Sequence, residues 1–136
     1  MTWIERRMAD LEEFRKRKSA IRERAVDIYE ALWKEITGHV EEAERKGFAI
    51  STNGALRKRS VLLEKKNKPG QFFELEIILV DAKDRIRATG DRVDFFLDLD
   101  LCPDGVVCLK LTGNQISVED AAIRVLDPFL FPELQG

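Results

Sequence analysis

The order of hydrophobic and polar residues divides the chain into a helical part and a part made of strands. Up to Lys46, apolar residues recur at three and four positions, the spacing of one face of an α-helix. From Phe48 onward the spacing shortens to two, as in half-buried strands. A last helical pattern opens at Ser117 and stops at Pro128. The pattern therefore predicts an α+β fold with a long N-terminal helix or helix pair, an antiparallel β-meander of five to six strands, and a short C-terminal helix.

Both ends of the N-terminal helical segment carry recognisable signals. Thr2 followed by Glu5 forms a capping box, and Gly47 stands where a glycine commonly ends a helix. Unbroken, residues 3–46 would extend about 66 Å, which is longer than the domain they must cover. We therefore expect a break near "RKRKSA", where Ser19 would cap a second helix. The alternative is one continuous helix that projects and pairs with a partner.

Turn residues in the strand region predict how neighbouring strands pair. Two-residue turns are expected at Asn53-Gly54, Ala82-Lys83 and Gly90-Asp91, and a further turn at "NKPG". The second and third of these turns place apolar residues opposite one another, which supports an antiparallel meander. The predicted pairs are Leu79 with Ile86, Ile77 with Ala88, Ala88 with Val93, and Ile86 with Phe95. The pairing of the strands within 47–66 stays open, because no register places all of their apolar residues on one face.

The stretch "DFFLDLDLCPDGVVCLKL", residues 94–111, contains four aspartates that could indicate a metal or acid–base site. A bulged turn with Gly105 in the left-handed conformation keeps the leucines of this stretch on one face. The neighbours predicted from this register are Lys110 for Asp98, Arg87 for Asp94 and Cys108 for Asp100, with Asp104 in the turn itself. Asp104 has a turn role and only Asp100 lacks a partner, so we expect a solvated hairpin face rather than a metal site.

The same register places Cys102 and Cys108 as diagonal neighbours about 7 Å apart, so free thiols are expected rather than a disulfide.

With 136 residues and a net charge of −2, the chain is expected to form one domain, 1–136. Its predicted parts are a helical segment at 1–46, an antiparallel sheet at 47–115, and a C-terminal helix with an apolar tail at 116–136. We expect no contact with membranes and a cytoplasmic location, because neither a membrane span nor a signal peptide is evident.

Residues suited to catalysis are few. His39 is the single histidine, so a nucleophilic triad or a typical zinc site could use no other. No phosphate-binding, dinucleotide-binding or metalloprotease motif is present. We predict no metal and no cofactor and assign no catalytic residue. An enzyme is not favoured, and His39 and Asp100 are the remaining candidates for a polar site.

The outer face of the predicted meander is more apolar than a solvent-exposed sheet face should be. It also offers a cation–π contact between Arg85 and Phe96. The C-terminal tail adds apolar residues between prolines, which either dock within the chain or contact a second copy. The candidate partner-binding residues are Phe72, Ile78, Val80, Arg85, Phe96, Phe129 and Phe131. We expect the outer face to be covered by one of the helices or by another subunit.

These features favour a non-enzymatic protein-interaction domain, homodimeric and chaperone- or adaptor-like, whose partner is a second copy or another protein. In outline it is similar to small acidic dimeric secretion chaperones, although the order of elements differs from theirs. One alternative is a small-ligand-binding protein or enzyme with a pocket between sheet and helices. Another is nucleic-acid binding, which requires the basic residues of 57–68 and 5–24 to share one surface.

Overall fold

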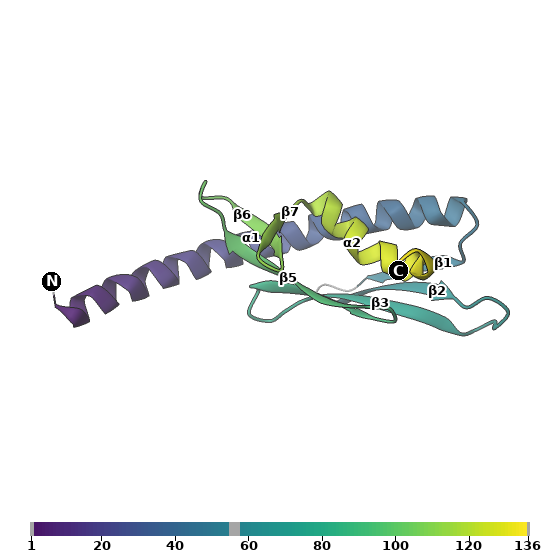
Figure 1. Ribbon diagram of the computed structural model, residues 1–136, viewed down its shortest axis with the longest axis horizontal. Helices are drawn as coiled ribbons and strands as arrows, with labels where there is room; N and C mark the ends of the chain where they lie inside the picture. The colour runs from purple at the N-terminus through teal and green to yellow at the C-terminus, as the bar shows by residue number, and fades with distance from the viewer. Residues whose placement is uncertain (1, 55–57, 136) are drawn as a thin grey trace.

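One helix, α1 (Trp3–Arg45), runs the length of the molecule, and the rest of the chain folds against its C-terminal half (Figure 1). The structure is a computed structural model that describes residues 2–54 and 58–135. The N-cap is Thr2, whose side chain accepts a hydrogen bond from the backbone N–H of Glu5 at 3.2 Å, as the capping box predicts. Beyond the C-cap, Gly47 takes the left-handed conformation expected of a glycine that ends a helix.

The break predicted near "RKRKSA" is wrong, because α1 is continuous over 43 residues. Ser19 is an interior residue of this helix. Ion pairs three or four positions apart, such as Arg7–Asp10 and Lys16–Glu12, support the exposed sides of the helix. The apolar spacing also keeps its phase through the segment, so neither side-chain pairing nor hydrophobic pattern requires a second helix.

Seven antiparallel strands form one sheet, and their order in space follows their order in the sequence. The strands are β1 (Ile50–Gly54), β2 (Lys58–Glu64), β3 (Phe72–Leu79), β4 (Arg85–Gly90), β5 (Val93–Leu101), β6 (Val107–Leu111) and β7 (Asn114–Ile116). The predicted α+β class and antiparallel meander are confirmed. The strand number exceeds the prediction because the short strand β7 adds an edge beside β6.

Most of the predicted register is confirmed. Leu79 pairs with Ile86 across β3 and β4, and the bulged turn pairs Asp98 with Lys110 across β5 and β6. Gly105 has the left-handed conformation that this bulge needs, with φ 82°. The predicted turn at Asn53-Gly54 is wrong, because both residues lie in β1, where they pair with β2. The connection between these two strands falls at 55–57, outside the described residues.

The turn predicted at Gly90-Asp91 lies one residue later, at Asp91-Arg92. As a result, each residue of β4 pairs with a β5 residue two positions beyond the predicted one. Gly90 is the last residue of β4 and pairs with Val93, so Ala88 faces Phe95 instead of Val93. The cause is a close approach to β3, because a Cβ on Gly90 would lie 2.1 Å from the carbonyl oxygen of Glu74. A shift of two positions keeps every side chain on its predicted face.

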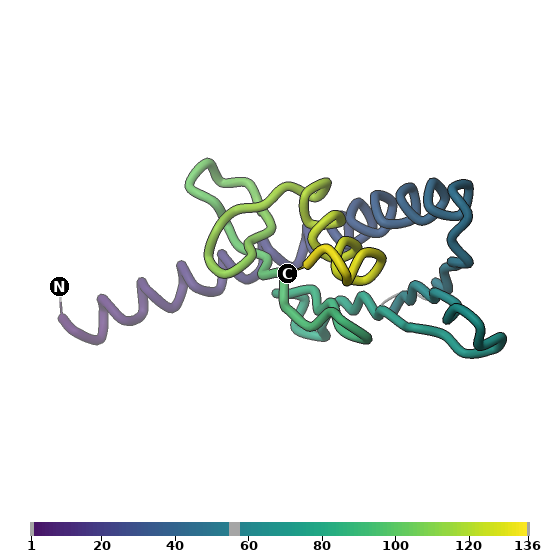
Figure 2. Tube along the Cα trace, turned by 45° about the vertical axis from the view of Figure 1, so that its right-hand side comes forward, coloured from purple at the N-terminus to yellow at the C-terminus, as the bar shows by residue number. Residues whose placement is uncertain are grey.

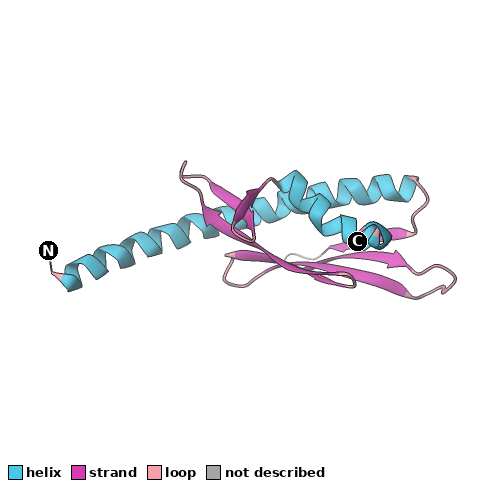
Figure 3. Ribbon diagram, in the orientation of Figure 1, coloured by secondary structure: helices cyan, strands magenta, loops and turns pink. Residues whose placement is uncertain are grey.

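Both helices lie on one face of the sheet (Figures 1 and 3). A single hydrophobic core fills the space between the helices and the sheet. The second helix, α2 (Val118–Leu130), is capped by Ser117 and extends past Pro128, where the sequence predicted its end. It lies beside the C-terminal half of α1, as the rotated view also shows (Figure 2). Among the largest fully buried side chains are Tyr29 of α1 and Phe129 of α2.

The arrangement of helices and sheet bears on two predictions, that the outer face of the sheet is covered and that no segment spans a membrane. No helix of the described chain covers the opposite face of the sheet, so the outer face is left open (Figure 3). Neither α1 nor α2 carries the uninterrupted apolar run that a bilayer crossing requires.

Candidate functional site

The N-terminal part of α1 extends beyond the sheet (Figures 1 and 2), and its apolar side chains are exposed to solvent. Its apolar side chains are 45–68% exposed, and they are Trp3, Ile4, Met8, Leu11 and Phe14. Positions 4, 8, 11, 14, 18, 21 and 25 lie along one side of the helix, spaced by three and four, and all of them except Lys18 are apolar. This side of the helix enters the core at Ile21, which is buried. The exposed stripe and the core-facing stripe are therefore one continuous surface, which we call the α1 seam.

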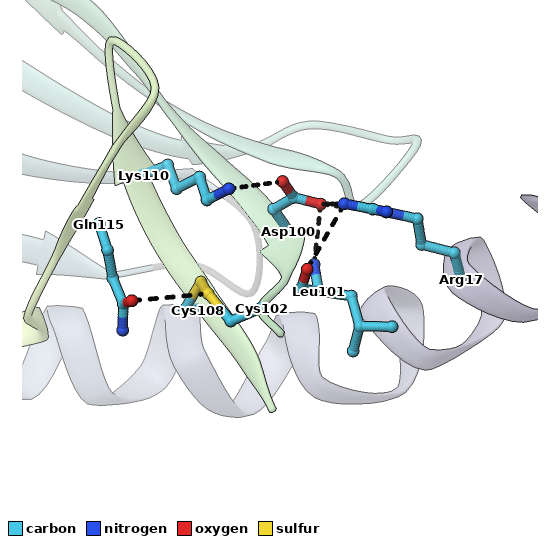
Figure 4. Close-up of polar contacts among 7 residues, drawn as sticks. All are labelled: Arg17, Asp100, Leu101, Cys102, Cys108, Lys110 and Gln115. Atoms are coloured by element: carbon cyan, nitrogen blue, oxygen red, sulfur yellow. Dashed lines mark hydrogen bonds and ion pairs between the residues drawn. A yellow bond between two sulfur atoms is a disulfide. The ribbon is translucent and has the colours of Figure 1, made fainter. Parts of the chain in front are cut away.

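An ion-pair cluster fixes α1 to the sheet at the point where the helix leaves the core (Figure 4). The Nε atom of Arg17 donates to Oδ1 of Asp100 at 3.1 Å, and Nζ of Lys110 donates to Oδ2 of the same carboxylate at 3.0 Å. The backbone N–H of Leu101 also donates to Asp100, at 2.8 Å. Asp100 was predicted to lack a cationic neighbour, and this prediction is wrong because a helix distant in sequence supplies one.

The environment of Asp100 determines its protonation. Hydrogen bonds from Arg17, together with those from Lys110 and Leu101, lower the pKa of Asp100 to about 2 and outweigh the opposing effect of burial. The carboxylate is thus ionised at every physiological pH and already has cationic partners. A general acid or base needs a pKa near the working pH, so this geometry serves attachment of α1 rather than proton transfer.

A disulfide joins Cys102 and Cys108 next to this cluster, and the prediction of free thiols is wrong (Figure 4). The two Cα atoms are 6.3 Å apart, shorter than the spacing estimated from an ideal strand pair and within the range of disulfides. Cys102 is buried, and its sulfur lies 3.7 Å from Oε1 of Gln115 on β7. The disulfide closes the hairpin that carries Asp100 and Lys110, so it supports the position of the ion-pair cluster.

A cavity of about 410 Å³ opens beside the ion-pair cluster, between α1 and the end of the sheet. Phe14 and Ile21 of the α1 seam contribute to its wall, and Leu99 and Ala82 contribute from the sheet side. Charged residues complete the wall, including Arg85 and Asp98, which form an ion pair at 3.3 Å. The cavity therefore marks the place where the exposed part of the seam meets the folded body.

A second charged cluster lies inside the sheet–helix interface. Arg59 on β2 is only 8% exposed, and its Nη1 donates to Oε2 of Glu30 on α1 at 3.1 Å. Its guanidinium also stacks over the rings of Tyr29 and Trp33, at 4.9 and 5.6 Å from their centroids. The hydrogen bond from Arg59 lowers the pKa of Glu30. In the sequence, Arg59 belongs to the basic segment 57–68, which was predicted to lie at the surface. The residues around Arg59 in the sequence do not indicate that it alone is buried.

His39, the other candidate for a polar site, is not near Asp100. It lies on α1, 22 positions beyond Arg17, which corresponds to about 33 Å along the helix. There it lines an apolar groove of about 260 Å³ between α1 and α2. The structure does not bring the two polar candidates together. Among residues 2–54 and 58–135, no group of three or more His, Cys, Asp and Glu side chains could hold a metal ion.

The candidate partner-binding residues are divided between two environments. Phe72 and Phe96 are exposed on the open outer face, where the guanidinium of Arg85 stacks 4.7 Å from the Phe96 ring as predicted. Ile78 and Val80 are half-buried. The tail residues differ from one another: Phe129 is fully buried in the core, whereas Phe131 packs edge-to-face on Phe48 at 5.7 Å but remains exposed, so only the first part of the tail docks within its own chain.

Part of the basic segment 57–68 lies far from the N-terminal basic segment that the nucleic-acid alternative requires beside it. Lys65, Lys66 and Lys68 lie in the β2–β3 hairpin, at the end of the molecule opposite the N-terminus (Figure 1).

Comparison of the chain with protein-family models, with curated proteins and with solved structures gives no match. Functional inference therefore depends on the geometry of the molecule itself.

Proposed function

We propose that the protein is a non-enzymatic, adaptor-like interaction module that self-associates through the exposed part of the α1 seam. The observation that carries the proposal is the continuity of the seam, because residues 3–14 extend the surface that packs on the sheet from Ile21 onward. Residues 3–14 are a short helical segment beyond the core, and a helix of about 12 residues is marginal in water unless its apolar face is packed. The exposed apolar side chains thus indicate a partner that completes the packing.

A second copy of the chain is the partner that the seam fits best. Two-fold symmetry requires a patch that is complementary to itself. If two seams run antiparallel about a point between Leu11 and Phe14, each Leu11 faces the Phe14 of the other copy. Asp10 then lies level with Arg15 of the other copy and Arg7 lies level with Lys18, so it is the apolar contact rather than charge that favours this pairing.

The same arrangement offers a place for the N-terminal end of each helix. Ile4 of one copy would lie level with Ile21 of the other, beside the cavity of about 410 Å³. Trp3, which is 68% exposed, would lie at the mouth of that cavity. Burial of such an aromatic anchor is the kind of contact that dominates interface energetics. The Arg17–Asp100 ion pair would hold α1 at the angle that this pairing needs.

Multi-angle light scattering of the full chain, over a wide concentration range, tests the proposal. The wild type is expected to dimerise with concentration, and the double variant Met8→Glu, Leu11→Glu is expected to be monomeric. The matched control is Val26→Glu, Ile123→Glu, which adds the same charge at exposed apolar positions outside the exposed part of the seam. A wild type that is monomeric at every concentration would refute the proposal.

The open outer face of the sheet is the competing surface. A third variant, Phe72→Glu with Phe96→Glu, distinguishes it from the seam, because both residues lie on that face. If the seam variant remained dimeric while this variant became monomeric, the proposed surface would be wrong.

A cytoplasmic location is part of the proposal, as the sequence predicts. Disulfides are uncommon in that compartment, so the Cys102–Cys108 disulfide of the structure counts against this location, and the state of the two cysteines in cells provides the test. Alkylation that finds two free thiols in rapidly quenched cells supports the location. A fully formed disulfide would point to an oxidising compartment instead.

A further inference from the structure

The largest cavity among those described lies at the end of the molecule opposite the N-terminus. It measures about 870 Å³ and is bounded by the β2–β3 hairpin, the connection from α1 to β1, and the 3₁₀ turn η1 (Pro132–Leu134). This volume is within the range of small-molecule sites. Its wall carries five cations: Lys46, Lys65, Lys66, Lys68 and Arg92. The carboxylates in the same wall are Glu64 and Glu133, so the cavity has an excess of positive charge.

These five cations differ from other basic residues of the sheet in having no ion pair. Within residues 2–54 and 58–135, no carboxylate oxygen lies within 4.0 Å of any of the five. By contrast, Lys58 and Arg59, at the start of β2, are paired with Glu76 and Glu30. Positive charges gathered around a concave surface without compensation raise the local concentration of anions. The cavity is therefore electrostatically suited to an anionic ligand.

Arg92 shows that the positive charge is held in place rather than merely exposed. Its Nη1 donates to the backbone oxygen of Phe129 at 3.0 Å, and its guanidinium lies 3.8 Å from the centroid of the Phe73 ring. Nζ of Lys65 lies 5.0 Å from the same ring, so two cations share one aromatic platform. Arg92 also has a left-handed backbone, with φ 73°, in a tight turn where glycine or asparagine would be ordinary.

An apolar groove adjoins this basic cavity. The groove of about 260 Å³ between α1 and α2 shares Lys46, Phe48, Leu130 and Phe131 with the basic cavity. A ligand with a charged head and an apolar tail could therefore place the head among the lysines and the tail against α2.

We propose that the basic cavity binds a phosphate-bearing small molecule. Lysine is a common phosphate ligand because its ammonium group acts as a compact point charge with three donors, and Arg92 adds a fixed guanidinium. The phosphate could belong to a free polyphosphate or to the headgroup of a lipid, and the adjoining groove suits the second source. The site lies at the end of the molecule away from the exposed part of the α1 seam, so it does not depend on self-association.

Isothermal titration of the full chain with two probes tests the site. Inorganic triphosphate represents the free source and decyl phosphate, below its micelle concentration, represents the lipid source. The variant Lys65→Gln, Lys66→Gln, Lys68→Gln is expected to weaken binding of the better probe at least tenfold. A matched control, Lys16→Gln, Lys34→Gln, Lys83→Gln, removes the same charge away from the cavity and is expected to change affinity by less than twofold. Binding is also expected to weaken as salt concentration rises.

The two probes separate the sources of the phosphate. Tighter binding of decyl phosphate, reduced by Ile123→Glu in the apolar groove, assigns the site to a lipid headgroup. Tighter binding of triphosphate, unaffected by Ile123→Glu, assigns it to a free polyphosphate. Absence of binding by both probes, or equal weakening in the cavity variant and the control variant, would overturn the proposal.

Discussion

Arg17 and Asp100 are 83 positions apart in the sequence, yet the guanidinium of one donates two hydrogen bonds to the carboxylate of the other. This pair joins the first part of α1 to the end of β5, where the helix leaves the core. Lys110, on the neighbouring strand, occupies the second carboxylate oxygen at 3.0 Å. The direction in which α1 extends from the body is thus tied to the sheet by charge as well as by apolar packing.

Replacement of Asp100 by asparagine is expected to lower the free energy of unfolding at neutral pH by about 1 kcal/mol, a value reduced by the partial exposure of Arg17. The hydrogen bonds from Arg17 lower the pKa of Asp100 from 3.8 to about 2. A lowered pKa means that the stabilisation is present above pH 3.8 and is lost as pH falls through about 2. Urea unfolding of wild type and Asp100→Asn as a function of pH measures this, and the two stabilities should converge in acid.

The control for this prediction is Asp94→Asn. Asp94 is paired with Arg87 at 3.7 Å but its side chain is 71% exposed, so little change is expected. If Asp100→Asn matched the wild type at neutral pH, or if the difference persisted at the acid limit, the attachment role of the pair would be wrong.

The ion pair between Arg59, which is buried, and Glu30, whose side chain is half-exposed, is expected to be energetically coupled. In a double-mutant cycle with Arg59→Met and Glu30→Gln, we expect a coupling free energy of about 1 kcal/mol, because Arg59 is donor to both carboxylate oxygens of Glu30 but solvent at the half-exposed carboxylate screens the pair. Chemical unfolding of the four proteins measures it. Glu30→Gln alone should be destabilising, and it should have little effect once Arg59 is replaced. Additive effects of the two substitutions would show that the pair contributes nothing beyond packing.

Tyr29 is expected to make the fold sensitive to alkaline pH. Burial raises the pKa of Tyr29 to about 12, since the neutral hydroxyl donates to the backbone oxygen of Ile77 at 2.5 Å within the core. A raised pKa means that this contribution is complete below pH 10 and is lost as pH rises through about 12, by about 2–3 kcal/mol in total. Tyr29→Phe should therefore be less stable than wild type near neutrality, by about 1 kcal/mol, and should lose less stability in alkali.

The measurement for Tyr29 has little interference, because the chain contains one tyrosine. The ultraviolet absorbance of the ionised ring then reports on Tyr29 alone, and unfolding at the same pH values can be followed by circular dichroism. Ionisation near the ordinary pKa of 10.0, without unfolding, would contradict the burial of this side chain.

The parts of the fold that the sequence predicted are those governed by local pattern. The period of apolar residues identified the helices and the meander, and Gly105 identified the bulge that sets Asp98 opposite Lys110. The displaced turn at Gly90 was missed because its cause, the approach of the Glu74 backbone, comes from a neighbouring strand. Local pattern also could not decide whether α1 breaks, since the apolar spacing is compatible with both forms.

The same distinction separates what was predicted of the candidate site from what was not. The Arg85–Phe96 contact followed from strand pairing and is present at 4.7 Å. Of the two cationic partners of Asp100, Arg17 was missed because it reaches the carboxylate from a distant helix, and Lys110 because it was assigned to Asp98, the residue opposite it. The disulfide was missed because an ideal spacing of diagonal residues overestimates the 6.3 Å between the two Cα atoms. The sequence pattern does not predict contacts between distant elements. It also does not predict small departures from ideal strand geometry.

Gly90 is expected to be the least replaceable glycine among the described residues. A Cβ at this position would lie 2.1 Å from the carbonyl oxygen of Glu74, and the backbone has φ 151°, so Gly90→Ala must displace β3 or β4. We expect the free energy of unfolding to fall by at least about 2 kcal/mol. The matched control is Gly38→Ala in α1, where a Cβ meets nothing within 4 Å and helix propensity predicts a gain of up to about 1 kcal/mol. Thermal and urea unfolding of both variants should give changes of opposite sign. Equal stability of Gly90→Ala and wild type would mean that β3 and β4 are not as close at this point as the register requires.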